Sequence, residues 1–293
     1  MIESDIVVRP LETMAEIAAA EDVQRVTWGM TDQEIIPAHA LHAMQHSGAA
    51  LLGAFDGNQL VGFAFGVLGT EDIPGRIDQV AAARLKMYSV IAGVLPAYQH
   101  RNVGYRLKMA QRDFCLRIGV RLVTWTYDPL ESPNGRFNIG KLGAVCHRYL
   151  RHFHGDMTGL NQGLQTDRFE VEWWVTSQRV KARATQKWRP LRLEALMAGG
   201  ALLVNEAGFN SAGLPVPPAN YISQPSNLML VEIPASFQTI KRQDLALAQR
   251  WRAHTRDIFE GMFDSGFLVT DFVAREDEDG RQHSYYLLTH QDS

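Results

Sequence analysis

The chain has 293 residues, of which 46% are apolar and 21% are charged, and its formal net charge is −3. This composition is that of a globular protein that can bury a sizeable core, and the length favours two domains. The slightly negative charge argues against a general nucleic-acid binder, which is normally basic, so we expect no nucleic-acid partner.

Cysteine and histidine usage indicates neither a disulfide framework nor a metal centre. Cys115 and Cys146 have no metal-ligand spacing. His147, His152 and His154 cluster without forming a ligand set, so we expect no metal. The N-terminus is charged at once, and no run of about 18 apolar residues exists to span a membrane. We therefore expect a cytoplasmic protein without membrane association.

The expected elements in the first part of the chain alternate between strands and helices. Thr13-Met-Ala-Glu16 has the spacing of a capping box and begins a helix that extends to about Trp28. Asp56-Gly57-Asn58 joins two apolar runs and is typical of a hairpin turn, and a polar loop contains Pro74 and Gly75. We expect strands at 6–11, 49–55, 59–68, 84–95, 121–127, 144–153 and 169–176, and helices at 13–28, 36–47, 103–118 and 134–142.

This order predicts an α/β (α+β) fold, in which a mixed, mostly antiparallel twisted sheet is flanked by helices. The composition changes after residue 182, and 207–227 is rich in Pro, Gly, Ser and Asn, which favours a loop or linker. Apolar runs at 200–205 and 228–233, an amphipathic helix at 242–264 and a hairpin formed by 267–274 and 284–289 predict a smaller α+β domain. The expected domains are therefore 1–182 and 183–293, the second packing on the first.

The stretch from Val94 to Lys108 indicates an anion site. An apolar run ends at Pro96, a short polar turn follows, and a helix begins at Val103 without an acidic residue in its first turn. Backbone N–H groups and the positive end of the helix dipole then point at one place, where phosphate is the usual ligand. The stripe predicted to be buried along this helix consists of Val103, Leu107, Ala110, Phe114 and Ile118.

The element order through residue 176 and the pattern Val94-x-Pro96-x-Tyr98-Gln99-x-x-Asn102-x-Gly104 resemble the GNAT superfamily of acyl-CoA-dependent N-acyltransferases. The family's turn signature is Gln/Arg-x-x-Gly-x-Gly/Ala. Here the turn reads Gln99-His100-Arg101-Asn102-Val103-Gly104. Asn102 replaces the first glycine, and asparagine is among the few residues that tolerate φ > 0. The resemblance covers about residues 5–180.

Further segments resemble a bacterial GNAT-like subgroup with a C-terminal extension. They are Asp128-Pro129-Leu130, Asn134, Asn138, Lys141-Leu142-Gly143, Asp167-Arg168-Phe169 and Val171-Glu172-Trp173. Asn134, Asn138 and Lys141 have a spacing at which one helix face can carry all three toward a ligand, and Lys141 is suited to bind a carboxylate or phosphate, although a solvated lysine at a helix end is the commoner reading.

The resemblance implies that strands 84–95 and 121–127 separate and hold the pantetheine of acetyl-CoA or another short acyl-CoA. Backbone groups near Val94 would pair with the pantetheine amides, and the N–H groups of Arg101–Gly104 would hold the pyrophosphate. A main-chain N–H near 91–93 would polarise the thioester carbonyl. The residues expected to bind the co-substrate are Val94, Gln99, His100, Arg101, Asn102, Val103, Gly104, Asn134, Asn138 and Lys141.

The acid and base have several candidates. Strand 84–95 lacks the Glu that many family members have there, and Ile139 occupies the position of their helix Tyr. Tyr127 is a candidate acid for the departing thiolate, although a buried strand Tyr is the commoner reading. Glu172, on an alternating strand flanked by aromatic residues, is a candidate base, although a strand Glu that is paired with an Arg or solvated is equally common. Asp128 competes with it, although Asp-Pro after a strand is often only a turn.

In the C-terminal helix, Arg252 and Arg256 share a face four residues apart. They are suited either to bind a carboxylate or, the more common case, to form a solvent-facing stripe.

The resemblance implies an N-acyltransferase that moves an acetyl or other short acyl group, with succinyl as an option, to the amine of a small molecule such as an amino acid. The reaction would be a direct attack in a ternary complex, and a homodimer is compatible with this reading. The alternative is a non-catalytic acyl-CoA-binding or regulatory protein on the same fold. A third reading is an unrelated α/β enzyme whose turn binds another nucleotide.

Overall fold

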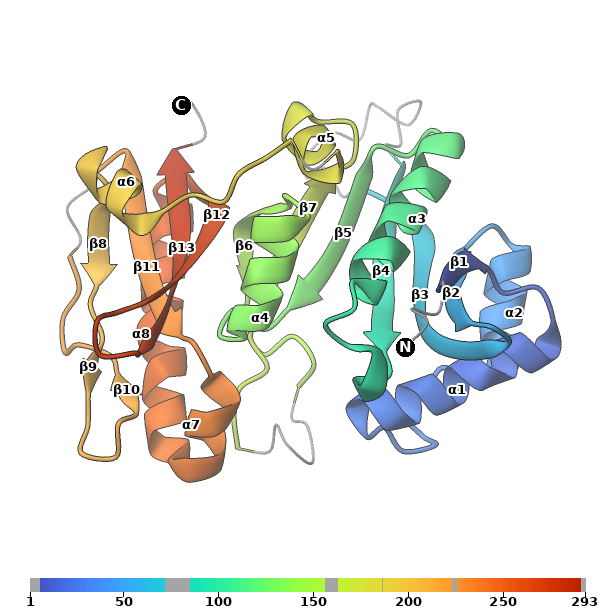
Figure 1. The fold of residues 1–293 in the computed structure, drawn as a ribbon, viewed down its shortest axis with the longest axis horizontal. Coiled ribbons are helices and arrows are strands. Elements are labelled where there is room, and N and C mark those ends of the chain that lie inside the picture. Colours follow the sequence, from blue (N-terminus) through green and yellow to red (C-terminus); the bar gives the residue numbers. More distant parts are fainter. Residues whose placement is uncertain (1–5, 72–84, 156–162, 186, 223–225, 291–293) are drawn as a thin grey trace. The chain divides into compact units, whose positions relative to one another are not determined.

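The computed structural model describes residues 6–71, 85–155, 163–185, 187–222 and 226–290 (Figure 1). The chain forms two compact units that interleave in sequence. Unit 1 comprises Met1–Trp125 and Trp174–Ser177, and unit 2 comprises Thr126–Trp173 and Gln178–Ser293. The sequence-based domain boundary at residue 182 stays a prediction.

Unit 1 contains a sheet with the strand order β1-β2-β3-β4-β5. Neighbours from β1 to β4 are antiparallel, whereas β4 and β5 run parallel. The strands are β1 (Val7–Pro10), β2 (Ala50–Asp56), β3 (Gln59–Thr70), β4 (Leu85–Val94) and β5 (Leu122–Tyr127), the last two residues of β5 belonging to unit 2. The helices are α1 (Met14–Trp28), α2 (Ala38–His46) and α3 (Val103–Arg117).

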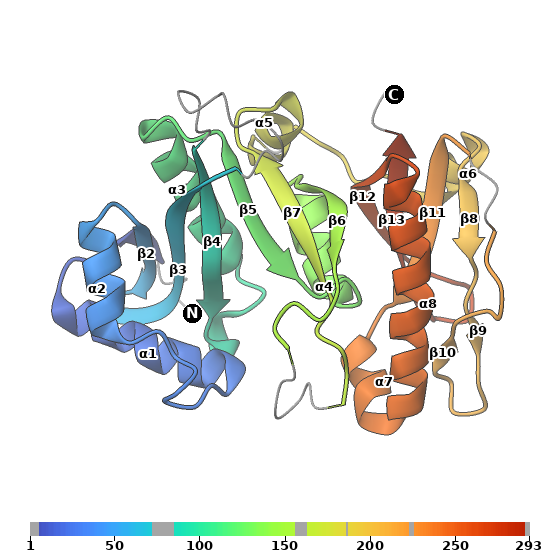
Figure 2. The same cartoon turned by 180° about the vertical axis from the view of Figure 1, so that it is seen from behind.

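The two faces of this sheet have separate cores because successive side chains of a strand point to opposite faces. Leu51, Phe63 and Phe65 pack with residues of α1 and α2. Their neighbours Leu52 and Ala64 pack with α3 on the other face. The helices therefore cover both faces of the sheet, as Figures 1 and 2 show.

Helix α1 begins at the predicted capping box. The Thr13 hydroxyl accepts a hydrogen bond from the Glu16 backbone N–H at 3.2 Å. The Glu16 carboxylate accepts from the backbone N–H of Thr13 in return, and Arg9 donates to it at 2.6 Å. The hydrogen bond from Arg9 is the main reason that the pKa of Glu16 is lowered to about 2.

Unit 2 contains a second run of strands, in the order β7-β6-β12-β13-β11-β8. These are β6 (Val145–Leu150), β7 (Arg168–Trp174), β8 (Leu202–Asn205), β11 (Leu228–Pro234), β12 (Phe267–Glu276) and β13 (Gln282–His290), the last residue of β7 belonging to unit 1. The short pair β9 (Gly208–Phe209) and β10 (Pro215–Val216) lies inside the segment that was predicted to be a loop. The helices are α4 (Ser132–Gly135), the π-helical turn η3 (Arg136–Lys141), α5 (Gln178–Ala184), α6 (Leu193–Ala198), α7 (Phe237–Gln243) and α8 (Leu245–Asp264).

The single helix predicted at 242–264 is wrong at its beginning, since α7 and α8 are separate helices. Asp244 separates them and caps α8, because its side chain accepts a hydrogen bond from the Leu247 N–H at 2.9 Å. The buried side of α8 includes Trp251, Ile258 and Phe259 as expected, but Leu245 is 43% exposed.

The predicted fold class is confirmed: helices flank a large mixed sheet, and the expected strand order through β7 is present.

The helix predicted at 134–142 begins earlier, at Ser132, and Gly143 follows it with φ 78°. The loop with Pro74 and Gly75 lies outside the described residues. Among the described helices, none combines the length and apolar character that crossing a membrane requires.

Candidate acyl-CoA site

Strands β4 and β5 pair over only part of their length. The parallel pairs are Lys86 with Leu122, Met87 with Val123, and Tyr88 with Thr124. Beyond Tyr88, β4 continues along β3 as far as Val94, whereas β5 runs on to Tyr127. The end of the pairing, which we call the fork, leaves an edge of β4 whose backbone groups are suited to pair with an extended ligand.

A β-bulge lies next to the fork. Phe65 of β3 pairs with Ile91, but the next residue, Gly66, pairs with Ser89, so Val90 is the extra residue on β4. Bulges re-orient backbone and side-chain groups and are common beside active sites. The bulge lies directly before the segment 91–93, where a main-chain donor was predicted, and that donor stays a prediction.

A buried lysine of α3 lies at the fork. Lys108 is 4% exposed, and its ammonium donates hydrogen bonds to Ser89 Oγ at 2.8 Å and to Gln111 Oε1 at 2.9 Å. It also lies 3.7 Å from the ring centroid of Trp125. Ser89 and Trp125 directly follow the last paired residues of β4 and β5, so Lys108 connects the two strands where they part. Burial lowers the pKa of Lys108 to about 7.

This lysine was missed from the sequence because the buried stripe of α3 was predicted from apolar residues alone. Ile118 is 44% exposed, whereas Lys108, Gln111 and Cys115 are buried together with Val103 and Leu107. The signal that was available is the spacing of Lys108, Gln111 and Cys115, which matches the helical period on the side of Leu107.

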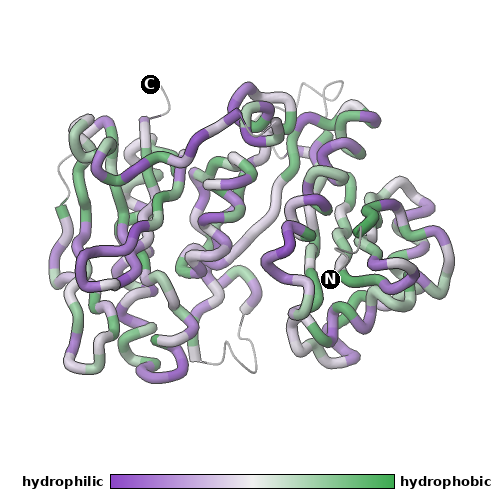
Figure 3. The backbone as a smooth tube through the Cα atoms, viewed as in Figure 1, coloured by the Kyte–Doolittle hydropathy of each residue, from purple (hydrophilic) through white to green (hydrophobic). Residues whose placement is uncertain are grey.

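The turn between β4 and α3 has the backbone conformation that the resemblance requires. His100 and Asn102 have φ values of 63° and 61°, so the left-handed conformation predicted for Asn102 is confirmed. Asn102 is the N-cap of α3, and the first turn of that helix contains no acidic residue. The turn is hydrophilic (Figure 3). The first N–H groups of a helix have no intrahelical acceptor and favour an anion.

Side-chain contacts hold this turn in place. The Tyr98 hydroxyl donates to Asp56 Oδ2 at 2.9 Å, which connects the turn to the β2–β3 hairpin. Gln99 Nε2 donates to the Val94 carbonyl at 3.2 Å, so two residues predicted to bind the co-substrate contact each other. The Arg101 guanidinium lies 5.2 Å from the Tyr98 ring centroid.

The residues of the turn fit a pyrophosphate group. His100 and Arg101 are exposed, as is Arg106 one turn into α3, whereas the Val103 side chain is buried and leaves only its backbone for binding. Two further cations of α3 do not contribute to this surface, because Lys108 is buried and Arg112 Nε donates to the Val175 carbonyl at 3.0 Å.

The candidate acid Tyr127 is part of the interior of unit 2. Its side chain is 4% exposed, and its hydroxyl lies 3.2 Å from that of Tyr286. Because the Tyr286 hydroxyl donates to the Pro129 carbonyl at 2.9 Å, Tyr127 is the donor to Tyr286. Burial and the neighbouring Tyr286 raise the pKa of Tyr127 well above its ordinary value.

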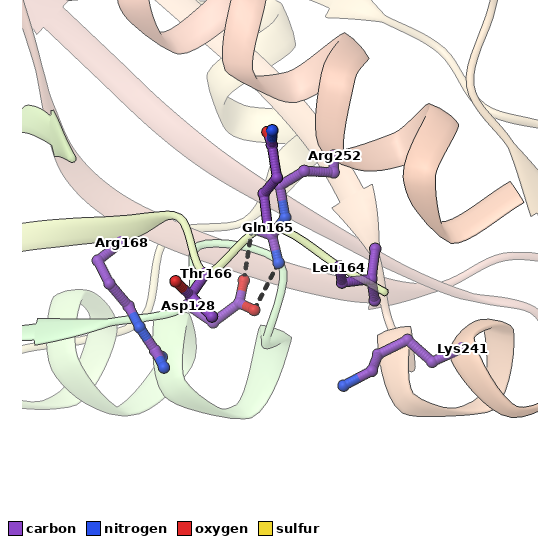
Figure 4. Close-up of a pocket in the computed structure, with 7 residues that line it drawn as sticks. All are labelled: Asp128, Leu164, Gln165, Thr166, Arg168, Lys241 and Arg252. Atoms are coloured by element: carbon purple, nitrogen blue, oxygen red, sulfur yellow. Dashed lines mark hydrogen bonds and ion pairs between the residues drawn. The ribbon is translucent and has the colours of Figure 1, made fainter. Parts of the chain in front are cut away.

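The candidate base Asp128 forms a bidentate ion pair. Arg252 donates to its two carboxylate oxygens at 2.8 and 2.5 Å (Figure 4), and the Leu130 N–H donates to Oδ1 at 2.9 Å. Arg252 is 3% exposed, so the solvent-facing stripe predicted for it is wrong, because α8 presents Arg252 to Asp128. Arg256, the other arginine of the predicted pair, forms an ion pair with Asp167 at 2.6 Å.

The other candidate base, Glu172, lies on β7, where burial alternates as predicted. Its side chain is 25% exposed and lies 3.9 Å from His147 Nε2.

Asn138 is buried, whereas Asn134 and Lys141 are exposed. The three therefore do not form one exposed face, since η3 is π-helical and changes the spacing. Within the described residues, no three His, Cys, Asp or Glu side chains are placed to hold a metal ion.

No protein-family model and no curated protein sequence matches the chain. Among solved structures, it is similar to Arabidopsis thaliana NAA60 in complex with a bisubstrate analogue (TM-score 0.47, 16% identity, covering 58% of this chain and 99% of that one). It is also similar to the putative acetyltransferase yncA of Salmonella typhimurium with acetyl-CoA (TM-score 0.46, 16% identity, 60% and 96%). An N-acetyltransferase of Staphylococcus aureus matches with a TM-score of 0.46 and 12% identity, over 59% and 100%. These are likenesses of fold.

Proposed function

We propose that the chain is an acyl-CoA-dependent N-acyltransferase. The observation that carries this proposal is the continuous strand–turn–helix of unit 1, in which the fork of β4 and β5 leads directly to the turn that contains Asn102. An acyl-CoA has an extended pantetheine arm joined to a pyrophosphate, and these two features match the two parts of the site. The co-substrate would be acetyl-CoA or another short acyl-CoA, with succinyl-CoA as an option.

Each part of the site has a distinct task. Backbone groups of β4 from Ser89 to Val94 would pair with the pantetheine amides, and the N–H groups of Arg101–Gly104 would bind the pyrophosphate. A main-chain N–H at the Val90 bulge would stabilise the developing oxyanion. Since a thioester is already electrophilic, positioning and proton transfer are the remaining requirements.

The acceptor would be the amine of a small molecule such as an amino acid, and it has to lose a proton. Glu172 is the proposed base, because its carboxylate is partly exposed, whereas both oxygens of Asp128 are held by Arg252. Tyr127 would act as the acid only if its hydrogen bond to Tyr286 were broken first.

A thiol-release assay tests the proposal. Purified protein is incubated with acetyl-CoA or succinyl-CoA and a panel of amino acids and other small amines, and free CoA thiol is measured. We expect release above the hydrolysis rate with at least one donor and amine pair. Binding of CoA without release for any pair would contradict catalysis.

A non-catalytic acyl-CoA-binding protein is the second candidate. The observation that favours it is the engagement of two predicted catalytic side chains, Tyr127 with Tyr286 and Asp128 with Arg252. Thiol release with any amine would end this reading.

A further inference from the structure

A single buried side chain, Lys108 of α3, bridges the fork of β4 and β5. Its ammonium donates a hydrogen bond to Ser89 Oγ at 2.8 Å and lies 3.7 Å from the ring centroid of Trp125. Ser89 and Trp125 are the first residues of the two strands beyond their last pair, Tyr88 with Thr124. One side chain therefore contacts both strands at the position where their pairing ends.

A further contact of Lys108 connects the fork to β3. The ammonium donates to Gln111 Oε1 at 2.9 Å, and the amide nitrogen of Gln111 faces away from it because an ammonium has no acceptor. A methyl group on Gly66 would lie 2.9 Å from that nitrogen, so Gln111 packs directly on the backbone of β3. Gly66 pairs with Ser89 at the bulge. Lys108 and Gln111 together therefore support both strands of the bulge.

A lysine is an uncommon choice for a buried helix position. Leu107 and Cys115 are also buried on α3, and an apolar side chain at position 108 would avoid the cost of burying an ammonium. The Lys108 side chain, in a residue that is 4% exposed, instead makes directional contacts with β4, β5 and its own helix. Such contacts fix the geometry of the fork, which an apolar side chain cannot do.

We propose that Lys108 is a positioning residue for the pantetheine arm of the acyl-CoA. It holds Ser89 and Trp125 in place, so that the edge of β4 beyond the bulge stays open to an extended ligand. Because the fork is the part of the site assigned to pantetheine, this role rests on the proposed function. Lys108 acts through the two strands and need not contact the ligand. Without it, β4 and β5 would be free to pair further or to move apart, and fewer molecules would accept the arm.

Calorimetric titration with two ligands separates this role from a general effect on the fold. The first ligand is CoA, and the second is 3′-phospho-ADP, which keeps the pyrophosphate but lacks the pantetheine arm. We expect Lys108→Met to weaken CoA binding about tenfold, as when about a tenth of the molecules has a competent fork, and to leave 3′-phospho-ADP binding unchanged. Arg117→Met is the matched control, because it removes an exposed cation from the last turn of the same helix and should leave both affinities unchanged.

Ser89→Ala provides a second variant that keeps Lys108 in the core. It removes the hydroxyl that accepts the hydrogen bond from Lys108, and it should weaken CoA binding by a smaller factor than Lys108→Met does. Since both substitutions remove the same contact, the double variant should lose less affinity than the product of the two single losses. Circular dichroism confirms that each variant is folded.

Three results would overturn the proposal. They are equal CoA affinity of the wild-type protein and Lys108→Met, an equal loss for CoA and 3′-phospho-ADP, and single losses that multiply in the double variant. The second of these would indicate a general effect on unit 1 in place of an effect on the fork. Absence of CoA binding to the wild-type protein would refute the proposed function itself, and this role of Lys108 with it.

Discussion

Replacing Lys108 by methionine should change how the stability of the protein depends on pH. Methionine has a similar length, but it has no ionisable group. The pKa of Lys108 falls from 10.5 to about 7, with burial as the largest cause. Between these two pH values the unfolded chain binds a proton that the folded protein does not bind.

The sign and size of the effect follow from this difference. Because the unfolded state holds more protons, the free energy of unfolding of the wild-type protein rises with pH above about 7. The full shift corresponds to about 5 kcal/mol, of which about 2 kcal/mol is gained between pH 7 and pH 9. These values are upper limits, since the hydrogen bonds to Ser89 and Gln111 favour the ammonium.

Urea denaturation of both proteins at pH 6 to 9 measures the effect. Buried tyrosines with raised pKa values act in the opposite direction at high pH, so the difference between wild type and Lys108→Met isolates the lysine. The difference should change by up to about 2 kcal/mol between pH 7 and 9. Lys181→Met, at an exposed lysine of α5, is the control. Parallel pH profiles for wild type and Lys108→Met would refute the reasoning.

Three further substitutions test other parts of the structure. Asp128→Ala leaves the buried Arg252 uncompensated and should cost about 3–5 kcal/mol of stability by urea denaturation, whereas an unchanged midpoint would contradict the pairing. Gly93→Ala places a methyl group against the Trp28 ring and should cost about 1–3 kcal/mol; the further change Trp28→Leu should recover part of this loss in melting temperature, and no recovery would argue against the clash. Glu172→Gln should lower the rate of thiol release while CoA affinity by calorimetry stays the same, and normal turnover would exclude Glu172 as the base.

The elements of the fold were predictable because their signals are local. The capping box at Thr13 and the left-handed Asn102 depend on neighbouring residues, and period-two burial on β7 is visible in the sequence. The break at Asp244 was missed because amphipathic periodicity continues across it, and only the cap reveals two helices.

The polar contacts of the site were not predictable, because their partners are distant in sequence. Asp128 and Arg252 are 124 residues apart, and a helical arginine without a visible partner is normally assigned to the surface. For Lys108, the helical spacing shared with Gln111 and Cys115 indicates the buried side of α3, whereas its contacts with Ser89 and Trp125, from two different strands, were not predictable.

Calorimetric titration of CoA into wild-type protein and Gly104→Val tests the central claim most directly, with ATP and NAD as competing nucleotides. Gly104 lies in the first turn of α3, where a valine side chain would project beside the N–H groups that are proposed to bind the pyrophosphate. The account predicts that CoA binds the wild-type protein more tightly than ATP or NAD, and that the variant loses this binding while remaining folded. Absence of CoA binding to the wild-type protein, or equal affinity in the two proteins, would contradict it.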